Sequence, residues 1–215
     1  MKKILLATSI IMSFTSFAQD CGDLFISEYV EGWSNNKALE IYNPTSSSID
    51  LSAYRVIRYS NGATSASAAN AIQLTGTVGA YDVHVGVLEK LDPNGTGQEA
   101  PIWDSLQARA DAFYCPEYNT SNAWYFNGND AIVLAKGSIS DIANADVIDI
   151  FGKIGEDPGD AWSSDFPYTG AGILVTKVHS LIRKSAIKKG EINPVISFFD
   201  PLLEYDSIPA VVVSF

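Results

Sequence analysis

Residues 24–45 read LFISEYVEGWSNNKALEIYNPT, and this stretch decides the fold. Side chains of an extended chain alternate between two faces. We therefore expect a strand over Leu24–Val30, with one face formed by Phe25, Ser27 and Tyr29. A second strand is expected over Lys37–Asn43, because β-forming residues there end at the Asn43–Pro44 turn. The pattern predicts a β-rich domain.

The same alternation recurs between turn residues along the rest of the chain. Tyr54–Tyr59 stops at Asn61–Gly62, a pair typical of hairpin turns. Further strands are expected over Ala71–Leu74, Tyr81–Leu88, Ala123–Phe126, Ala131–Leu134, Val147–Phe151 and Ile173–Leu181. Short strands at this spacing predict a mainly β fold of the sandwich type. One short helix is expected over Ile102–Ala112, where apolar residues recur at helical spacing after Pro101.

The first residues, 1–18, are expected to be a secretory signal peptide, which leaves one domain over residues 19–215. Lys2 and Lys3 precede an uncharged apolar stretch, and small residues at Ser16 and Ala18 fit a cleavage site. The stretch is shorter than the roughly 20 apolar residues of a membrane span, so an uncleaved anchor is the less favoured alternative. We expect a bacterial protein that is secreted or at the cell surface, with no membrane span.

The chain carries a formal net charge of −11, and loss of Lys2 and Lys3 makes the exported part more acidic. General attraction to nucleic acid or to an anionic membrane is therefore not expected. The two cysteines, Cys21 and Cys115, predict a disulfide in an oxidising compartment, with two unpaired thiols as the alternative. A lipoprotein anchored at Cys21 is not expected, because Asp20 precedes that residue.

Six segments, taken in order, resemble the lamin-tail domain family in the form found in secreted proteins of Bacteroidetes-type bacteria. They are LFISEYVEG at Leu24–Gly32, NNKALEIYNPT at Asn35–Thr45, IDLSAYRVIRYSNG at Ile49–Gly62, FNGNDAIVLAK at Phe126–Lys136, DVIDIFGKIGEDPGDAW at Asp146–Trp162 and SLIRKSAI at Ser180–Ile187. The resemblance implies an immunoglobulin-like β-sandwich. It also implies a non-catalytic module of a kind that often accompanies nucleases, phosphatases or other hydrolases. The chain departs from the family after Tyr205, where a closing strand with Leu-Gly and a histidine would be expected.

An acidic turn is the candidate metal site. Glu156, Asp157 and Asp160 surround Pro158–Gly159, and such carboxylates could supply oxygen ligands to calcium. The spacing is not that of an EF-hand, so solvated turn acids are the favoured interpretation. No cofactor other than this calcium is expected.

Two further features suggest binding. The segment 177–189 gathers five basic residues, of which Arg183 and Lys184 are candidate contacts to a polyanion, including nucleic acid. A solvent-facing strand with a lysine-rich turn is the favoured alternative, since no stacking aromatic lies nearby in the sequence. Trp33 lies in an apparent loop and could stack on a sugar or a partner, whereas Trp124 and Trp162 are expected to pack between sheets.

Catalytic patterns are missing from the sequence. There is no nucleophile elbow and no phosphate-binding glycine loop, so we do not expect an enzyme. The expected function is extracellular binding or adhesion, with a protein, a glycan or a polyanion as partner. The alternative is the N-terminal accessory domain of an extracellular hydrolase such as a nuclease. Reading the gene beyond Phe215 would separate the two.

Overall fold

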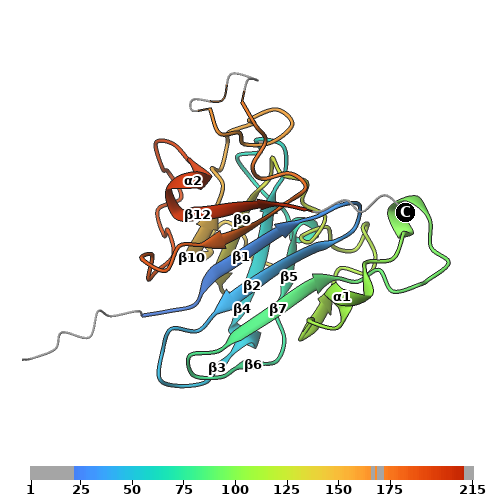
Figure 1. Cartoon of the computed structure of the whole chain (residues 1–215). Coiled ribbons are helices and arrows are strands. Elements are labelled where there is room, and N and C mark those ends of the chain that lie inside the picture. Colours follow the sequence, from blue (N-terminus) through green and yellow to red (C-terminus); the bar gives the residue numbers. More distant parts are fainter. Residues whose placement is uncertain (1–21, 166–167, 169–171, 211–215) are drawn as a thin grey trace, which may run out of the picture.

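The computed structural model describes residues 22–165, 168 and 172–210, so the expected signal peptide lies outside the described residues. A six-stranded sheet faces the viewer in Figure 1, with the strand order β12-β11-β1-β2-β7-β8. Its strands are β1 (Phe25–Glu31), β2 (Lys37–Tyr42), β7 (Val83–Leu88), β8 (Ala112–Tyr114), β11 (His179–Arg183) and β12 (Tyr205–Pro209). All neighbours are antiparallel except β7 and β8, which are parallel.

A four-stranded sheet lies behind the first, in the order β10-β9-β4-β5. Its strands are β4 (Tyr54–Tyr59), β5 (Ala71–Gln73), β9 (Ala131–Lys136) and β10 (Asp146–Phe151). A small third sheet pairs β3 (Ile49–Asp50) with β6 (Thr77–Val78). The expected mainly β, immunoglobulin-like sandwich is confirmed.

The core fills the space between the two large sheets. Tyr29 of β1 stacks on Phe151 of β10 with ring centroids 4.0 Å apart, and Trp162 packs edge-on against Phe151. Ile26 and Tyr29 are both fully buried although three positions separate them. A register shift between Ile26 and Glu28 explains this, because a β-bulge interrupts strict alternation. Tyr29 therefore does not share a face with Ser27 as simple alternation predicted.

The expected helix over Ile102–Ala112 is much shorter in the structure. Only α1 (Asp104–Gln107) is helical, and 3-10 turns occur at η1 (Leu51–Ala53), η2 (Ala68–Asn70) and η3 (Gly97–Glu99). The chain leaves the helix because Asp111 makes two hydrogen bonds to Val85, which draw Ala112–Tyr114 into the sheet. Leu106 and Ala110 still pack on the outer face of the sheet, against Ala38 and Val87. A second short helix, α2 (Pro201–Glu204), was not expected.

Most of the expected strands are present, with ends moved by at most two residues, but two expectations need correction. Ala123–Phe126 is not a strand, because a turn at residues 123–124 leads into an irregular stretch. Trp124 in this turn stacks on Tyr114, and its indole nitrogen donates to the Gly86 carbonyl. The apolar residues of Ala123–Phe126 therefore serve the core without forming a strand. Of Ile173–Leu181, only the part from His179 onward is in a strand.

Candidate binding groove

The basic segment 177–189 is largely occupied by internal contacts. Lys177 pairs with Asp160, and Lys184 Nζ donates to the Leu202 carbonyl of α2 at 2.5 Å. Arg183 is buried and forms two hydrogen bonds with Asp149, at 2.6 and 3.1 Å. Arg183 is therefore held mainly by this internal ion pair, and its contact with a polyanion stays a prediction. Its strand alternation turns the side chain inward, toward a buried carboxylate.

Asp149 is the centre of this buried network. Besides Arg183, its carboxylate accepts from the backbone N–H groups of Ile26, Ile150 and Glu191, each at 2.8 Å. It thereby ties β1, β10, β11 and the segment before α2 together. Asp130 plays a similar part by accepting from Arg58 Nε and from two backbone N–H groups. The segments Phe126–Lys136 and Asp146–Trp162, which contain these two acids, therefore help to stabilise the fold.

The three acids of the predicted calcium turn are held by separate partners. Glu156 accepts from Lys153 Nζ and from the Trp162 indole, each at 3.0 Å. Asp157 accepts from the Gly159 N–H, and Asp160 pairs with Lys177. Within the described residues, no group of three or more His, Cys, Asp or Glu side chains is placed to hold a metal ion. Each of the three acids is therefore engaged by a protein partner, and calcium binding at this turn stays a prediction.

The predicted disulfide is not present at Cys115, which is a buried free thiol. Cys21 lies outside the described residues. The Cys115 sulfur lies 3.3 Å from the Ser121 hydroxyl, and burial raises the pKa of the thiol. Cys115 follows β8 and lies near the end of β7, whereas Gly22 lies before the start of β1. Cys115 and Gly22 are therefore at opposite ends of the six-stranded sheet.

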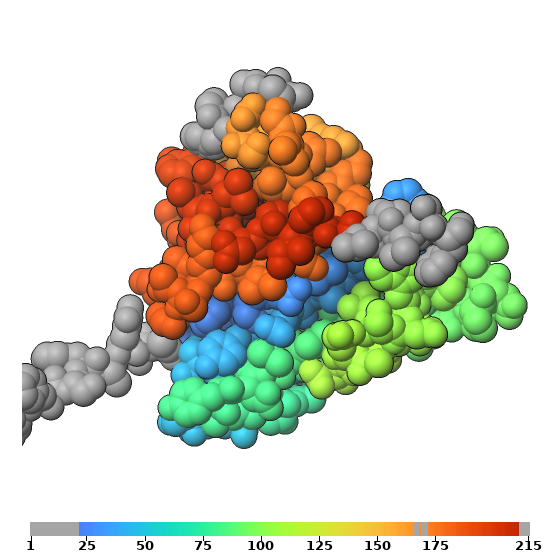
Figure 2. All heavy atoms as spheres, viewed as in Figure 1, coloured from blue at the N-terminus to red at the C-terminus, as the bar shows by residue number. Residues whose placement is uncertain are grey.

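An open groove of about 430 Å³ lies on the outer face of the six-stranded sheet, at the beginning of β1. We call it the aromatic–basic groove; it is lined by Phe25, Ser27, Tyr42, Pro44, Tyr81, Arg183, Lys184, Ser185, Ile187 and Lys188. Figure 2 shows the blue strands β1 and β2 on this face beside the orange-to-red C-terminal segments. The sheet order explains the grouping, because β11 lies next to β1 and brings residues after Arg183 beside Phe25.

The aromatic wall of this groove is held in place from below. Phe25 and Tyr42 pack edge to face with centroids 5.5 Å apart, and the Arg183 guanidinium lies 5.4 Å from the Phe25 ring. Tyr81 has a backbone φ of 57°, which is unusual for a bulky residue, and its side chain is 64% exposed. Strain of this kind is a feature of binding sites, where it persists because the surrounding structure enforces it.

The basic side of the groove comes from Lys184 and Lys188. Lys188 is exposed, whereas Lys184 is half-buried because it caps the carbonyls of α2. An acid lies beside this groove as well, since Glu40 Oε1 accepts from the Ser27 hydroxyl at 2.7 Å. The rim therefore combines stacking surfaces with cations, which suits a ligand that has both ring faces and negative charge.

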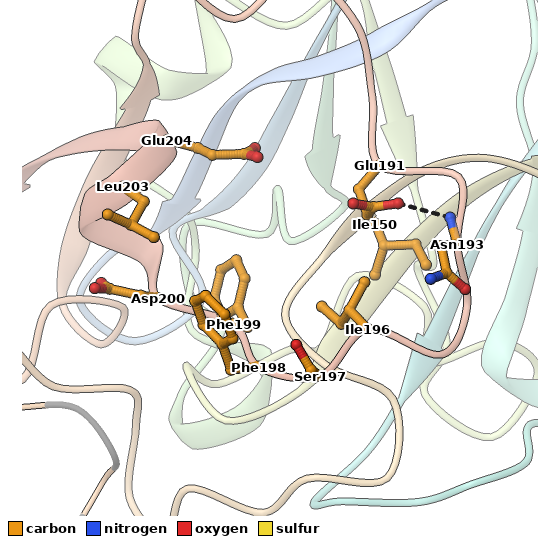
Figure 3. Close-up of a pocket in the computed structure, with 10 residues that line it drawn as sticks. All are labelled: Ile150, Glu191, Asn193, Ile196, Ser197, Phe198, Phe199, Asp200, Leu203 and Glu204. Carbon is orange, nitrogen blue, oxygen red and sulfur yellow. Dashed lines mark hydrogen bonds between the residues drawn. The ribbon is translucent and has the colours of Figure 1, made fainter.

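A second cleft, of about 330 Å³, lies between β10 and the segment 191–204. Figure 3 shows its apolar side chains and the hydrogen bond from the Asn193 N–H to Glu191. Its carboxylates already have partners: Asp200 caps the first turn of α2, and Glu204 pairs with Arg183. This cleft therefore offers a weaker case for ligand binding than the aromatic–basic groove.

The remaining candidate residues fall into two groups. Trp33 is 56% exposed, as expected, while Trp124 and Trp162 are fully buried, also as expected. His84 is buried with Nε2 3.0 Å from the Tyr114 hydroxyl, and burial lowers the pKa of its imidazole. No sequence pattern indicated that Phe25, Tyr42 and Tyr81 lie beside Lys184 and Lys188. This grouping depends on the placement of β11 beside β1, and local sequence patterns do not reveal which strands are neighbours in a sheet.

The fold is an immunoglobulin-like β-sandwich with an open groove on the outer face of its six-stranded sheet. The model of the family described as Lamin Tail Domain matches residues 18–152, and the chain belongs to this family of non-catalytic domains. No curated protein and no solved structure matches the chain. The described residues beyond the matched range are part of the same sandwich, since β11 pairs with β1 and β12 pairs with β11. No helix among the described residues has the length and apolar character needed to cross a membrane.

Proposed function

We propose that this chain is a secreted, non-catalytic binding module that holds an acidic polysaccharide in the aromatic–basic groove. The observation that carries the proposal is the meeting of Tyr81 and Phe25 with Lys184 and Lys188 along one open groove. The C–H bonds of a pyranose ring can pack against the face of an aromatic side chain, because that aromatic face is electron-rich. A carboxylate on the same sugar can pair with a lysine.

The overall charge supports a local and oriented mode of binding. With a net charge of −11, the chain as a whole repels a polyanion, so attraction depends on local cations such as Lys184 and Lys188 at the groove. Export through residues 1–18 would place the groove where cell-surface and matrix polysaccharides occur. The open shape of the groove suits a passing polymer chain.

Affinity electrophoresis of residues 19–215 in gels containing polygalacturonate tests this proposal. We expect retardation that weakens as salt rises, since lysine–carboxylate attraction is screened. Tyr81→Ala should weaken binding about tenfold through loss of one stacking surface. Lys188→Ala should also weaken binding and reduce the salt dependence.

Two matched controls are available on the surface. Tyr118 is an exposed tyrosine outside the groove, and Lys189 is an exposed lysine that does not line it. Tyr118→Ala and Lys189→Ala should therefore bind like the parent chain. Equal losses in the control variants, or no retardation at all, would contradict the proposal. Binding of single-stranded DNA in place of polygalacturonate would assign the groove to a different ligand and overturn it as well.

A further inference from the structure

Two exposed tryptophans lie close together at the opposite end of the six-stranded sheet from the aromatic–basic groove. Trp33 lies in the loop after β1 and is 56% exposed. Trp103 lies immediately before α1 and is 46% exposed. Its neighbour Ile102 points inward and packs on Val87, which leaves the indole of Trp103 on the solvent side. Figure 1 shows α1 near the end of β7.

One buried amide connects the two tryptophans. Asn36 is only 3% exposed, and its Nδ2 donates to the Trp33 carbonyl at 2.6 Å. Its Oδ1 accepts from the Trp103 N–H at 2.7 Å. Both groups of a single side-chain amide are therefore used to hold the backbones of Trp33 and Trp103 beside each other. We call the two indoles and this clamp the tryptophan platform.

The loop that carries Trp33 is fixed by further contacts. Asn35 Nδ2 donates to the carbonyls of Gln98 and Ala100, at 3.1 and 2.6 Å. Ser34, next to Trp33, has a backbone φ of 60°, in the left-handed region. A Cβ on Gly32 would lie 2.9 Å from the Asn36 carbonyl oxygen, so only glycine fits this close approach. The platform is thus preorganised, which lowers the entropy cost of binding.

The charges around the platform differ from those of the groove. Glu99 and Asp104 are both exposed, and Lys90 is buried in an ion pair with Glu99 at 2.6 Å. Arg109 lies further along, where its guanidinium donates to the Ser105 carbonyl and interacts with Glu28. The negative charges of Glu99 and Asp104 disfavour an anionic ligand at the platform. The carboxylate oxygens of these two residues can accept hydrogen bonds from hydroxyl groups of a ligand.

We propose that the tryptophan platform is a second binding site, which takes the pyranose rings of a neutral polysaccharide. Two half-exposed indoles on neighbouring backbones offer two stacking faces to successive sugars. Exposed polar side chains at Ser34, Gln98 and Glu99 stand beside them to pair with sugar hydroxyls. The site goes beyond the proposed function, since it uses other residues and a ligand of different charge.

The test is affinity electrophoresis of residues 19–215 in gels that contain laminarin, hydroxyethylcellulose, xylan or galactomannan, with polygalacturonate in a parallel gel. We expect retardation by at least one of the four neutral polymers, insensitive to salt. Trp33→Ala and Trp103→Ala should each weaken it about tenfold, because each removes one stacking face. Circular dichroism of each variant checks that the sandwich is still folded.

Tyr81→Ala is the control that separates the two sites. It should leave retardation by the neutral polymer unchanged, and the tryptophan variants should leave retardation by polygalacturonate unchanged. No retardation by any neutral polymer, or retardation that folded tryptophan variants retain, overturns the inference. Neither result bears on the groove, whose failure would appear only in the polygalacturonate gel.

Discussion

Asp130 and Asp149, both buried, each have several hydrogen-bond partners, whereas Glu28 on the outer face of the six-stranded sheet does not have this support. Asp130 is fully buried and accepts from Arg58 and from the N–H groups of Asn61 and Asn127. Glu28 lies directly opposite Glu40 on the neighbouring strand. Burial, followed by the charge of Glu40, raises the pKa of Glu28, despite a hydrogen bond from Ser180.

The raised pKa of Glu28 predicts a cost to stability at neutral pH. The unfolded chain ionises this group near its ordinary value of 4.5, whereas the folded chain keeps its proton to a higher pH. The free energy of unfolding therefore falls as the pH rises through this interval. Glu28→Gln should raise it by about 0.5 kcal/mol at pH 7, the usual size of a cross-strand like-charge term.

Urea denaturation at pH 7 and at pH 3.5 measures this effect. At pH 3.5 the parent and the variant should agree, because Glu28 is then protonated in both states. Glu117 is exposed and serves as a control, so Glu117→Gln should change stability at neither pH. A gain from Glu28→Gln that persists at pH 3.5 would rule out the charge explanation.

Asp149 connects three strands and the segment before α2. Its carboxylate receives N–H donors from β1, from β10 and from the segment before α2, together with the Arg183 guanidinium of β11. The two large sheets are thus linked by a polar contact inside an apolar core. Such a contact is costly to break, because removal of one partner leaves a buried charge alone.

Asp149→Ala should lower the free energy of unfolding by about 3–5 kcal/mol, the range for a broken buried ion pair. Denaturant titration followed by tryptophan fluorescence gives the value. Asp146→Ala, an exposed change on the same strand, is the matched control and should cost far less. If Asp149→Leu with Arg183→Met is as unstable as Asp149→Ala, the uncompensated charge is not the cause.

The whole molecule extends well past the end of the family match at residue 152. The later residues supply β11 and β12 to one flank of the six-stranded sheet. They also add Trp162, Phe199 and Tyr205 to the core, all in ring contact with Phe151. Without them, β1 would become an unprotected edge strand and Asp149 would lose Arg183.

A chain of residues 19–152 should therefore fail to fold cooperatively. Thermal unfolding followed by circular dichroism, and dispersion of amide signals in NMR, are the measurements. A chain of residues 19–210 is the control and should keep the sandwich, since it contains every described strand. A sharp, cooperative melt of the shorter chain would show that the matched region folds alone.

The sequence by itself determined the class of fold and many of its local features. Alternation and turn residues located β4 at Tyr54–Tyr59 without error, and Asp50 and Asp157 accept the local N–H groups that turn acids commonly accept. These features are readable because they depend on neighbours within a few residues.

Only the tertiary structure decided which side chains meet. The placement of β11 beside β1 buries Arg183 on Asp149 and brings Lys184 and Lys188 to Phe25 and Tyr81. Likewise, the side chain of Asn36 joins the backbone of Trp33 to that of Trp103, which lies 67 positions after Asn36 in the sequence. Local sequence patterns do not reveal the order of strands in a sheet. That order is set when the apolar faces of the two large sheets are buried against each other, which involves residues far apart in the sequence. The candidate binding surfaces therefore became visible only in the folded chain.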